Sequence, residues 1–249
     1  MNFVKTDKEI KIMKKSGQIC AKALRKVLDN VKPQITCKEL DTIAEKEIRS
    51  LGATPSFMTV DNYKWTICTT INEQVVHGIP NNTTLKEGDI LGVDIGALYM
   101  GYHSDLAITV PVGKISEETE KFLLTGRKTL EEAIKKARSG NHIQDISETI
   151  QNGIQSQGYS IVESLTGHGI GKELHEDPLV PGVGTKGQGP KILKNMTLAI
   201  EVIYAAGSGD VGLEEDGWTI STKDKSLAGL FEQTVAITDN GPIVLTPYL

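Results

Sequence analysis

The sequence has few of the features that mark secreted or membrane proteins. It contains 3 cysteines in 249 residues and no CxxC pair, which excludes a disulfide-stapled scaffold and predicts a reduced, cytoplasmic protein. A membrane-spanning helix needs a run of about 18 or more apolar residues, and the sequence has none. The first residues also lack the apolar core of a signal peptide. We therefore expect no membrane partner.

Positive charge is scarce as well. Lys and Arg number 27 against 32 Asp and Glu, which gives a formal net charge of −5, whereas a nucleic-acid binder normally presents a basic face. The densest basic cluster, 5–15, is interleaved with acidic and apolar residues, and we interpret it as the solvated face of a helix. The glycine-rich stretch 167–171 has neither the GxGxxG pattern nor a GK[ST] ending, which disfavours a phosphate-binding loop. No nucleic-acid partner is expected.

What is present is the composition of an ordinary globular protein. Hydrophobic residues make up 39% and charged residues 24% of the chain, which is enough aliphatic surface to offset the entropy of ordering. No stretch has the composition of a linker. We therefore expect a single domain over residues 1–249, with a monomer as the default assembly.

In the predicted order of elements, pairs of helices alternate with groups of strands, whereas single helices do not alternate with single strands. Capping boxes that begin at Thr6 and Thr36 predict one pair of helices, and caps at Ser116 and Asn141 predict a second pair. The predicted strands are 65–71, 89–98, 102–112, 197–205, 217–222, 229–238 and 243–246. This order predicts an α+β fold with two halves of similar element order. We expect an antiparallel-rich sheet backed by helices.

Two aspartates interrupt the apolar strands of the predicted hairpin 89–112. If the turn is centred between positions 99 and 100, Asp94 lies directly opposite Asp105 on one face. Facing carboxylates repel each other, and partial burial adds a large desolvation penalty. A cation between them would remove both penalties. The alternative is that one aspartate is a turn residue and the register differs.

Three further residues are out of place in the same way. Glu201 and Glu232 each interrupt an apolar strand that contains no Lys or Arg, and His168 stands between glycines. Charged residues are rarely buried unless they are paired or bind metal. Four carboxylates and one imidazole form an oxygen-rich site, unlike a structural zinc site, and their charge balances two divalent ions. A structural calcium site is the alternative, but no DxDxDG loop is present.

The remaining histidines divide into two groups. His77 precedes a predicted tight turn, and His175 follows His168 closely in the sequence. Neutral imidazoles beside a metal centre can hydrogen-bond a substrate amide or a developing oxyanion. Each of them taken alone is also compatible with a structural role. We interpret His103 and His142 as structural.

In combination these stretches resemble the methionine aminopeptidase family, which has the pita-bread fold. The resemblance runs in order through nearly the whole chain, and the short spacing from Glu201 to Glu232 resembles type I rather than type II members. The matching stretches are 71–80, Asp94 with Asp105, 166–171, 175–178, 200–201, 216–219 and 231–234.

The resemblance implies a site and a reaction. Asp94, Asp105, His168, Glu201 and Glu232 would hold two divalent ions, either Co, Mn, Fe or Zn. Glu201 would also shuttle a proton, His175 would stabilise the oxyanion, and His77 would contact the scissile amide. The substrate would be a peptide or nascent protein that begins with methionine. The side chains implied to line the pocket for that methionine are Tyr63, Cys68 and Trp218.

Several positions depart from the family pattern without removing a metal ligand. Leu174 stands where an aromatic residue is usual, and Phe57 and Val60 stand where a small residue and a tyrosine are expected. These three concern the methionine pocket. The others are Val202 in place of proline, Gln233 in place of histidine, and Ala228 in place of a serine that helps to hold a monovalent cation.

Two other functions remain open at this stage. An X-Pro aminopeptidase or prolidase would share the five ligands, but such enzymes usually carry an additional N-terminal domain, for which the residues before the first predicted strand leave no room. The second is a pita-bread protein that has lost catalysis and binds a partner. Loss of a ligand would favour it, whereas all five are present.

Overall fold

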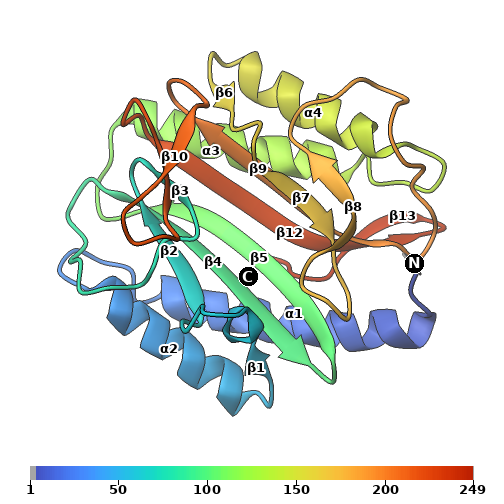
Figure 1. Ribbon diagram of the computed structural model, residues 1–249, viewed down its shortest axis with the longest axis horizontal. Coiled ribbons are helices and arrows are strands. Elements are labelled where there is room, and N and C mark those ends of the chain that lie inside the picture. Colours follow the sequence, from blue (N-terminus) through green and yellow to red (C-terminus); the bar gives the residue numbers. More distant parts are fainter. Residues whose placement is uncertain (1–3, 249) are drawn as a thin grey trace.

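The computed structural model describes residues 4–248, and its four helices begin close to the predicted caps (Figure 1). Thr6 and Thr36 form capping boxes with Glu9 and Glu39, as predicted. The fourth helix begins one residue later than expected, because His142 rather than Asn141 is its N-cap and its N–H donates to Asp145. The helices are α1 (Asp7–Leu28), α2 (Cys37–Ser50), α3 (Glu117–Ile134) and α4 (Ile143–Gln155).

The strands form one large antiparallel sheet and one small sheet. The large sheet has the order β1-β4-β5-β12-β9-β7-β8, with β2, β6 and β13 paired to β4, β9 and β12. Its strands are β1 (Thr54–Pro55), β2 (Ile67–Ile71), β4 (Ile90–Tyr99), β5 (Tyr102–Pro111), β6 (Ser160–Ile161), β7 (Thr166–Gly169), β8 (Glu176–Pro181), β9 (Thr197–Ala205), β12 (Ala228–Thr238) and β13 (Gly241–Val244). The small sheet contains β10 (Val211–Leu213), β11 (Ile220–Thr222) and β3 (Gln74–Val76). A short 3₁₀ turn, η1, spans Phe57–Thr59.

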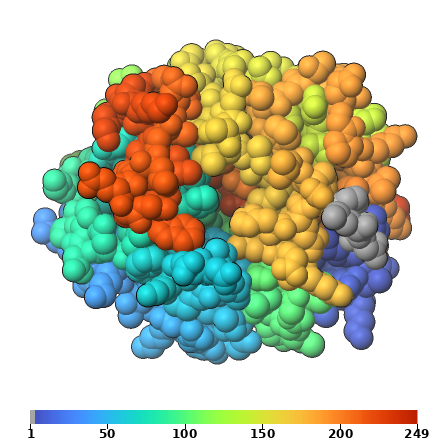
Figure 2. Space-filling model, viewed as in Figure 1, coloured from blue at the N-terminus to red at the C-terminus, as the bar shows by residue number. Residues whose placement is uncertain are grey.

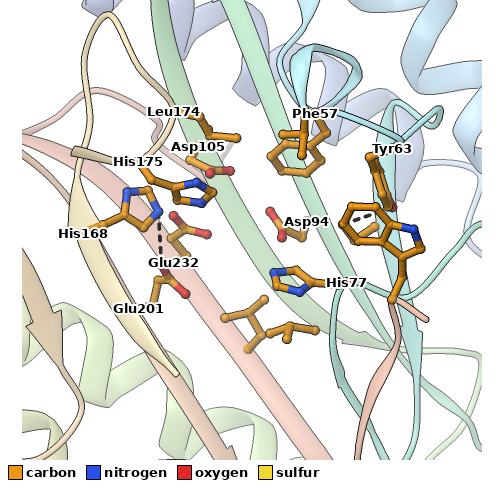
Figure 3. Close-up of a pocket in the computed structure, with 15 residues that line it drawn as sticks. Phe57, Tyr63, His77, Asp94, Asp105, His168, Leu174, His175, Glu201 and Glu232 are labelled. Carbon is orange, nitrogen blue, oxygen red and sulfur yellow. Dashed lines mark hydrogen bonds and ion pairs between the residues drawn. The ribbon is translucent and has the colours of Figure 1, made fainter. Parts of the chain in front are cut away.

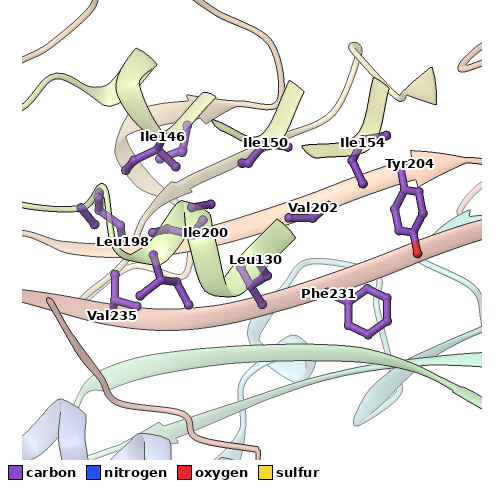
Figure 4. Packing of buried hydrophobic residues seen from close by; sticks show 14 of the residues in the cluster. Leu130, Ile146, Ile150, Ile154, Leu198, Ile200, Val202, Tyr204, Phe231 and Val235 are labelled. Carbon is purple, nitrogen blue, oxygen red and sulfur yellow. The ribbon is translucent and has the colours of Figure 1, made fainter. Parts of the chain in front are cut away.

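Alternation along the strands places all four helices on one face of the large sheet. In β4 the residues at 91, 93, 95 and 97 join the core under α1 and α2. In β9 the residues at 198, 200, 202 and 204 join the core under α3 and α4. Asp94 in β4 and Glu201 in β9 alternate with these core residues, so their side chains point to the face of the sheet without helices. Figure 4 shows the second core, where Leu130, Ile150, Ile200, Val202 and Phe231 pack together.

The predicted two-part organisation is confirmed. Each half supplies two helices followed by strands, and the halves meet where β5 pairs with β12 at the centre of the sheet (Figure 1). This pairing joins Ala107 to Glu232 and Leu106 to Gln233. The fold is α+β with an antiparallel sheet backed by helices, as expected. No helix among residues 4–248 is long and apolar enough to cross a membrane.

The predicted register of the β4–β5 hairpin is wrong, because the centre of the turn lies one residue further along the chain than predicted. Tyr99 pairs with Tyr102, so the turn is formed by Met100 and Gly101 rather than centred between 99 and 100. Both turn residues have positive φ angles, 50° and 80°, which is the backbone that a two-residue hairpin turn with right-handed strand twist requires. Asp94 consequently pairs with Ala107, and Asp105 pairs with Gly96. The two aspartates are diagonal neighbours on one face.

The basic cluster 5–15 is also not entirely a solvated helix face. Lys8, Lys11, Lys14 and Lys15 are exposed on α1. Lys5 lies before the helix and retains only 7% exposure, because it forms an ion pair with Glu176. The charges next to Lys5 in the sequence do not indicate that Lys5 is buried, because its partner Glu176 is 171 positions away.

Candidate metal centre and substrate pocket

Two rows of residues run across the face of the sheet that carries no helices. In the first row Asp94 pairs with Ala107, Ala107 with Glu232, and Glu232 with Glu201. In the second row Gly96 pairs with Asp105, and Ala199 pairs with both Thr234 and His168. Thr234 completes this row, because its Oγ1 accepts the Asp105 N–H at 2.9 Å. The strands β4, β5, β12, β9 and β7 thus bring all five predicted ligands onto one surface.

These five side chains converge on a small volume (Figure 3). Ligand atoms of Asp105, His168 and Glu232 all lie within 4.8 Å of one another, and all three residues are buried. Glu201 adjoins this group, with its Oε1 3.4 Å from His168 Nε2. Asp94 Oδ1 and Glu232 Oε1 are buried with no hydrogen-bond partner among residues 4–248. Buried carboxylate oxygens without partners are costly unless a cation binds them.

The electrostatics of the cluster favour a bound cation. Burial raises the pKa of Asp94, Glu201 and Glu232 well above the ordinary range, and the charge of Asp105 raises each of them further. Burial raises the pKa of Asp105 to about 7. Burial, followed by the charge of His175, lowers the pKa of His168 to about 4. Without metal, the carboxyl groups of the cluster therefore tend to retain protons. Bound divalent ions would allow all four of them to ionise.

His168 is oriented as a metal ligand should be. Its Nδ1 lies 2.8 Å from the carbonyl oxygen of Gly169, so Nδ1 carries the hydrogen and donates it. This leaves the lone pair of Nε2 directed toward the carboxylates. A hydrogen bond from the second ring nitrogen to a backbone carbonyl is the usual way in which proteins fix the tautomer of a ligating histidine.

Metal removal should therefore produce an unusual dependence of stability on pH. Between pH 7.5 and 8.5 the imidazoles of His77, His168 and His175 are neutral in the fold, because burial lowers their pKa values. They are largely neutral in the unfolded chain as well, because the ordinary histidine pKa is about 6.5. The clustered carboxyls have raised pKa values, so the folded state binds more protons than the unfolded state, and the free energy of unfolding falls as the pH rises. We expect the melting temperature of chelator-treated protein to fall across this window. Divalent ion should flatten or reverse the slope, and parallel slopes with and without ion would contradict the cluster's role.

An apolar cavity adjoins the carboxylate cluster. Its walls include Tyr63, Cys68 and Trp218, the three residues implied for the methionine pocket, together with three of the six positions that depart from the family pattern. Tyr63 packs against Trp218 at a ring-centroid distance of 5.1 Å, and its hydroxyl donates to the Cys68 sulfur. The further lining residues are Phe57, Val60, Val76, Leu174 and Leu230. Figure 2 shows the opening of this hollow, with β12 visible at its base.

Three residues that line or support the cavity escape a sequence-based prediction. Val76 and Leu230 line the cavity as ordinary apolar strand residues, so nothing in their type distinguishes them from core. Asp216 fixes the turn that carries Trp218 by accepting the N–H groups of Trp218 and Thr219 at 2.8 Å. An aspartate two residues before an aromatic residue in a loop is the signal that could have identified this turn.

Both predicted catalytic histidines line the same cavity. The His175 ring lies 4.4 Å from the His168 ring, centroid to centroid, in an edge-to-face arrangement. His77 has a positive φ of 58°, a backbone conformation that costs free energy outside glycine and persists only where the surrounding structure holds it. Burial lowers the pKa of both imidazoles, which keeps them neutral at pH 7. His103 and His142 are not among the lining residues.

Comparison with known proteins agrees with this geometry. The model of metallopeptidase family M24 matches residues 11–239. A methionine aminopeptidase of Clostridium perfringens is 44% identical over 246 residues, covering 99% of each chain. The crystal structure of a methionine aminopeptidase from Thermotoga maritima superposes with a TM-score of 0.96 at 41% identity, covering 98% of each chain. A prolidase from Pyrococcus horikoshii superposes with a TM-score of 0.82 at 25% identity, covering 100% of this chain and 65% of the prolidase.

The chain therefore belongs to metallopeptidase family M24, whose members are hydrolases that use divalent metal. Within that family it belongs with the methionine aminopeptidases, which it matches along nearly their whole length. The X-Pro alternative is not favoured, because the prolidase shares less sequence and extends well beyond the matched region. A buried cluster of carboxylates and histidine is compatible with the family's metal requirement.

Proposed function

We propose that this protein removes the N-terminal methionine from peptides and nascent proteins in the cytoplasm, acting as a monomer. The observation that carries the proposal is the position of the carboxylate cluster, with its unpartnered oxygens on Asp94 and Glu232, directly beside an apolar cavity. A side chain of methionine's size and polarity suits a cavity walled by aromatic and aliphatic residues and one cysteine. The scissile bond then lies over the cluster.

Two divalent ions suit the five donor residues. Asp94, Asp105, His168, Glu201 and Glu232 would hold the ions, with Asp105 and Glu232 near the centre of the group. Fe, Mn, Co and Zn all accept such a mixed oxygen and nitrogen set. Such ions supply an activated water and a Lewis acid that polarises the substrate carbonyl.

The protein's own side chains account for the proton movements. Glu201 lies at the edge of the cluster beside His168 and can carry a proton from the attacking water toward the leaving amine. His175 faces the cavity as a neutral imidazole and can donate a hydrogen bond to the oxyanion that forms at the carbonyl. His77 can contact the amide nitrogen of the scissile bond.

The position of the substrate's amino group would account for release of a single residue. Phe57, Tyr63 and Trp218 pack together as one wall of the cavity that would receive the methionine side chain. The free amino group of the substrate would lie near the carboxylates. In its charged form it would be attracted by them, and in its neutral form it could donate its electron pair to a bound ion. An internal peptide bond would place a blocked nitrogen there.

A paired-peptide assay tests this proposal. Metal-stripped protein is resupplied with Mn²⁺ or Co²⁺ and offered peptides that begin Met-Ala or Ala-Pro, with mass spectrometry as the readout. We expect loss of methionine from the first peptide and no cleavage of the second, because the cavity selects the first side chain. Cleavage of Ala-Pro alone would assign the X-Pro function. Absence of cleavage by protein with bound metal would contradict both and favour a binding role.

A further inference from the structure

One buried ion pair lies outside the carboxylate cluster and has no assigned role. Lys5 Nζ lies 2.5 Å from Glu176 Oε2, with side-chain exposures of 7% and 19%. In every other Lys or Arg ion pair that the structure shows within residues 4–248, both side chains are more than a third exposed. Pairs of that exposed kind contribute little to stability. A desolvated pair is expensive to bury and therefore calls for an explanation.

Glu176 uses both of its carboxylate oxygens. While Oε2 takes the lysine, Oε1 accepts the backbone N–H groups of Lys172 and Glu173 at 2.8 and 3.2 Å. The Glu176 carboxylate therefore closes the loop 171–176 on itself. The lysine neutralises the charge that this loop closure would otherwise leave buried.

Gly171 shows how closely the lysine is fitted to this loop. A Cβ atom added at Gly171 would lie 2.4 Å from Lys5 Cε and 2.6 Å from Glu176 Oε1, so only glycine leaves room for the lysine side chain to pass. The lysine is itself held in place, because its backbone N–H donates to Asn195 at 2.8 Å. The Gly171 carbonyl oxygen also accepts the His103 N–H at 2.8 Å. The loop is thus tied to the rest of the molecule on two sides.

The loop carries two side chains of the site. Leu174 and His175 immediately precede Glu176, and both point into the cavity (Figure 3). Because Glu176 directly follows His175 in the chain, Glu176 cannot shift without moving the His175 backbone. The His175 ring packs edge-to-face on the His168 ring at a centroid distance of 4.4 Å. We propose that Lys5 is a positioning residue that acts through Glu176 to hold His175 at the reacting carbonyl, which makes the segment before α1 part of the catalytic apparatus.

The inference rests on the role proposed above for His175, and kinetics of the metal-loaded protein test it. Lys5→Met removes the charge and retains the apolar stem. We expect kcat for Met-Ala peptide release to fall about tenfold to a hundredfold, the range for a misplaced catalytic group, with KM and metal content little changed. Lys5→Arg keeps the positive charge and should therefore retain more of kcat than Lys5→Met does. Lys194→Met is the matched control, because its partner Asp239 is exposed and the residue adjoins Asn195.

A double-mutant cycle separates positioning from general stability. If Lys5 acts through His175, Lys5→Met should lower kcat less than about twofold in a His175→Ala background, since coupled groups are not additive. Equal losses in both backgrounds, or an unchanged kcat with a lower melting temperature, would overturn the proposal. If Lys5→Met does not fold, Lys5→Met/Glu176→Gln removes both charges and undergoes the same cycle. Failure of the unmodified protein to release methionine would instead overturn the proposed function.

Discussion

Replacement of Glu232 by glutamine is expected to abolish divalent-ion binding and peptide cleavage while raising the melting temperature of the metal-free protein. Glu232 lies at the centre of the site, where its carboxylate is buried with one unpartnered oxygen. Its pKa is raised by burial and by the charges of Asp105, Glu201 and Asp94. The folded, metal-free protein must therefore protonate this carboxyl or bury its charge, and either costs free energy. A neutral amide of the same shape avoids that cost but cannot balance the charge of an ion.

The two effects have opposite signs because the site is organised for a ligand rather than for stability of the chain alone. Loss of activity should exceed the roughly 10²–10³-fold loss that follows removal of one oxyanion donor, since the ion site itself would fail. In a protein of this size each kcal/mol gained raises the melting temperature by about 2–4 °C. Removal of the protonation or burial cost of one of the four clustered carboxyl groups should therefore be visible by calorimetry.

The measurement combines calorimetry with chelator, metal titration and the Met-Ala peptide assay. Glu163→Gln is the matched control, because Glu163 is exposed in a loop and should change neither quantity. Retention of cleavage with metal bound would refute the proposed role of Glu232 as a metal ligand. A lower melting temperature in the metal-free state would show that the carboxylate is satisfied within the fold and would remove the argument from unpartnered oxygens.

The sequence was informative about the site for a simple physical reason. A charged residue in an apolar strand, such as Asp94 or Glu201, is conspicuous because burial requires a partner. The caps of the helices were equally visible, because Thr6 and Thr36 satisfy their N–H groups with residues three positions away. Both the buried charged residues and the helix caps can thus be predicted from residues that are close together in the sequence. The family resemblance added the roles of the residues.

What escaped prediction depends on contacts between distant residues. Asp105 meets Thr234 across 129 positions, and this pairing rather than an Asp94–Asp105 pair gathers the ligands. The hairpin register was missed because a positive φ at Met100 is not visible in its side chain. Short strands such as β3 and β10, with three residues each, are too brief to show a period of two. The burial of Lys5 follows only from the placement of Glu176.

Replacement of His175 by alanine should lower kcat by roughly 10²–10³-fold, the effect of losing one preorganised oxyanion donor. The imidazole faces the cavity and its lowered pKa keeps it neutral, so it can donate one hydrogen bond without adding charge beside the ions. Because this hydrogen bond strengthens only as charge develops on the carbonyl oxygen, kcat and kcat/KM should fall together while KM stays nearly constant.

Metal content decides whether this reading of His175 is correct. The ring packs on His168 at 4.4 Å, so its removal could also loosen a ligand, and loss of metal would then replace loss of the oxyanion donor as the cause. His142→Ala provides the control, because His142 caps α4 outside the cavity. Full metal occupancy with a proportional fall of kcat and kcat/KM supports the oxyanion role. Lost metal, or a rise in KM alone, contradicts it, since neither follows from an interaction made only in the transition state.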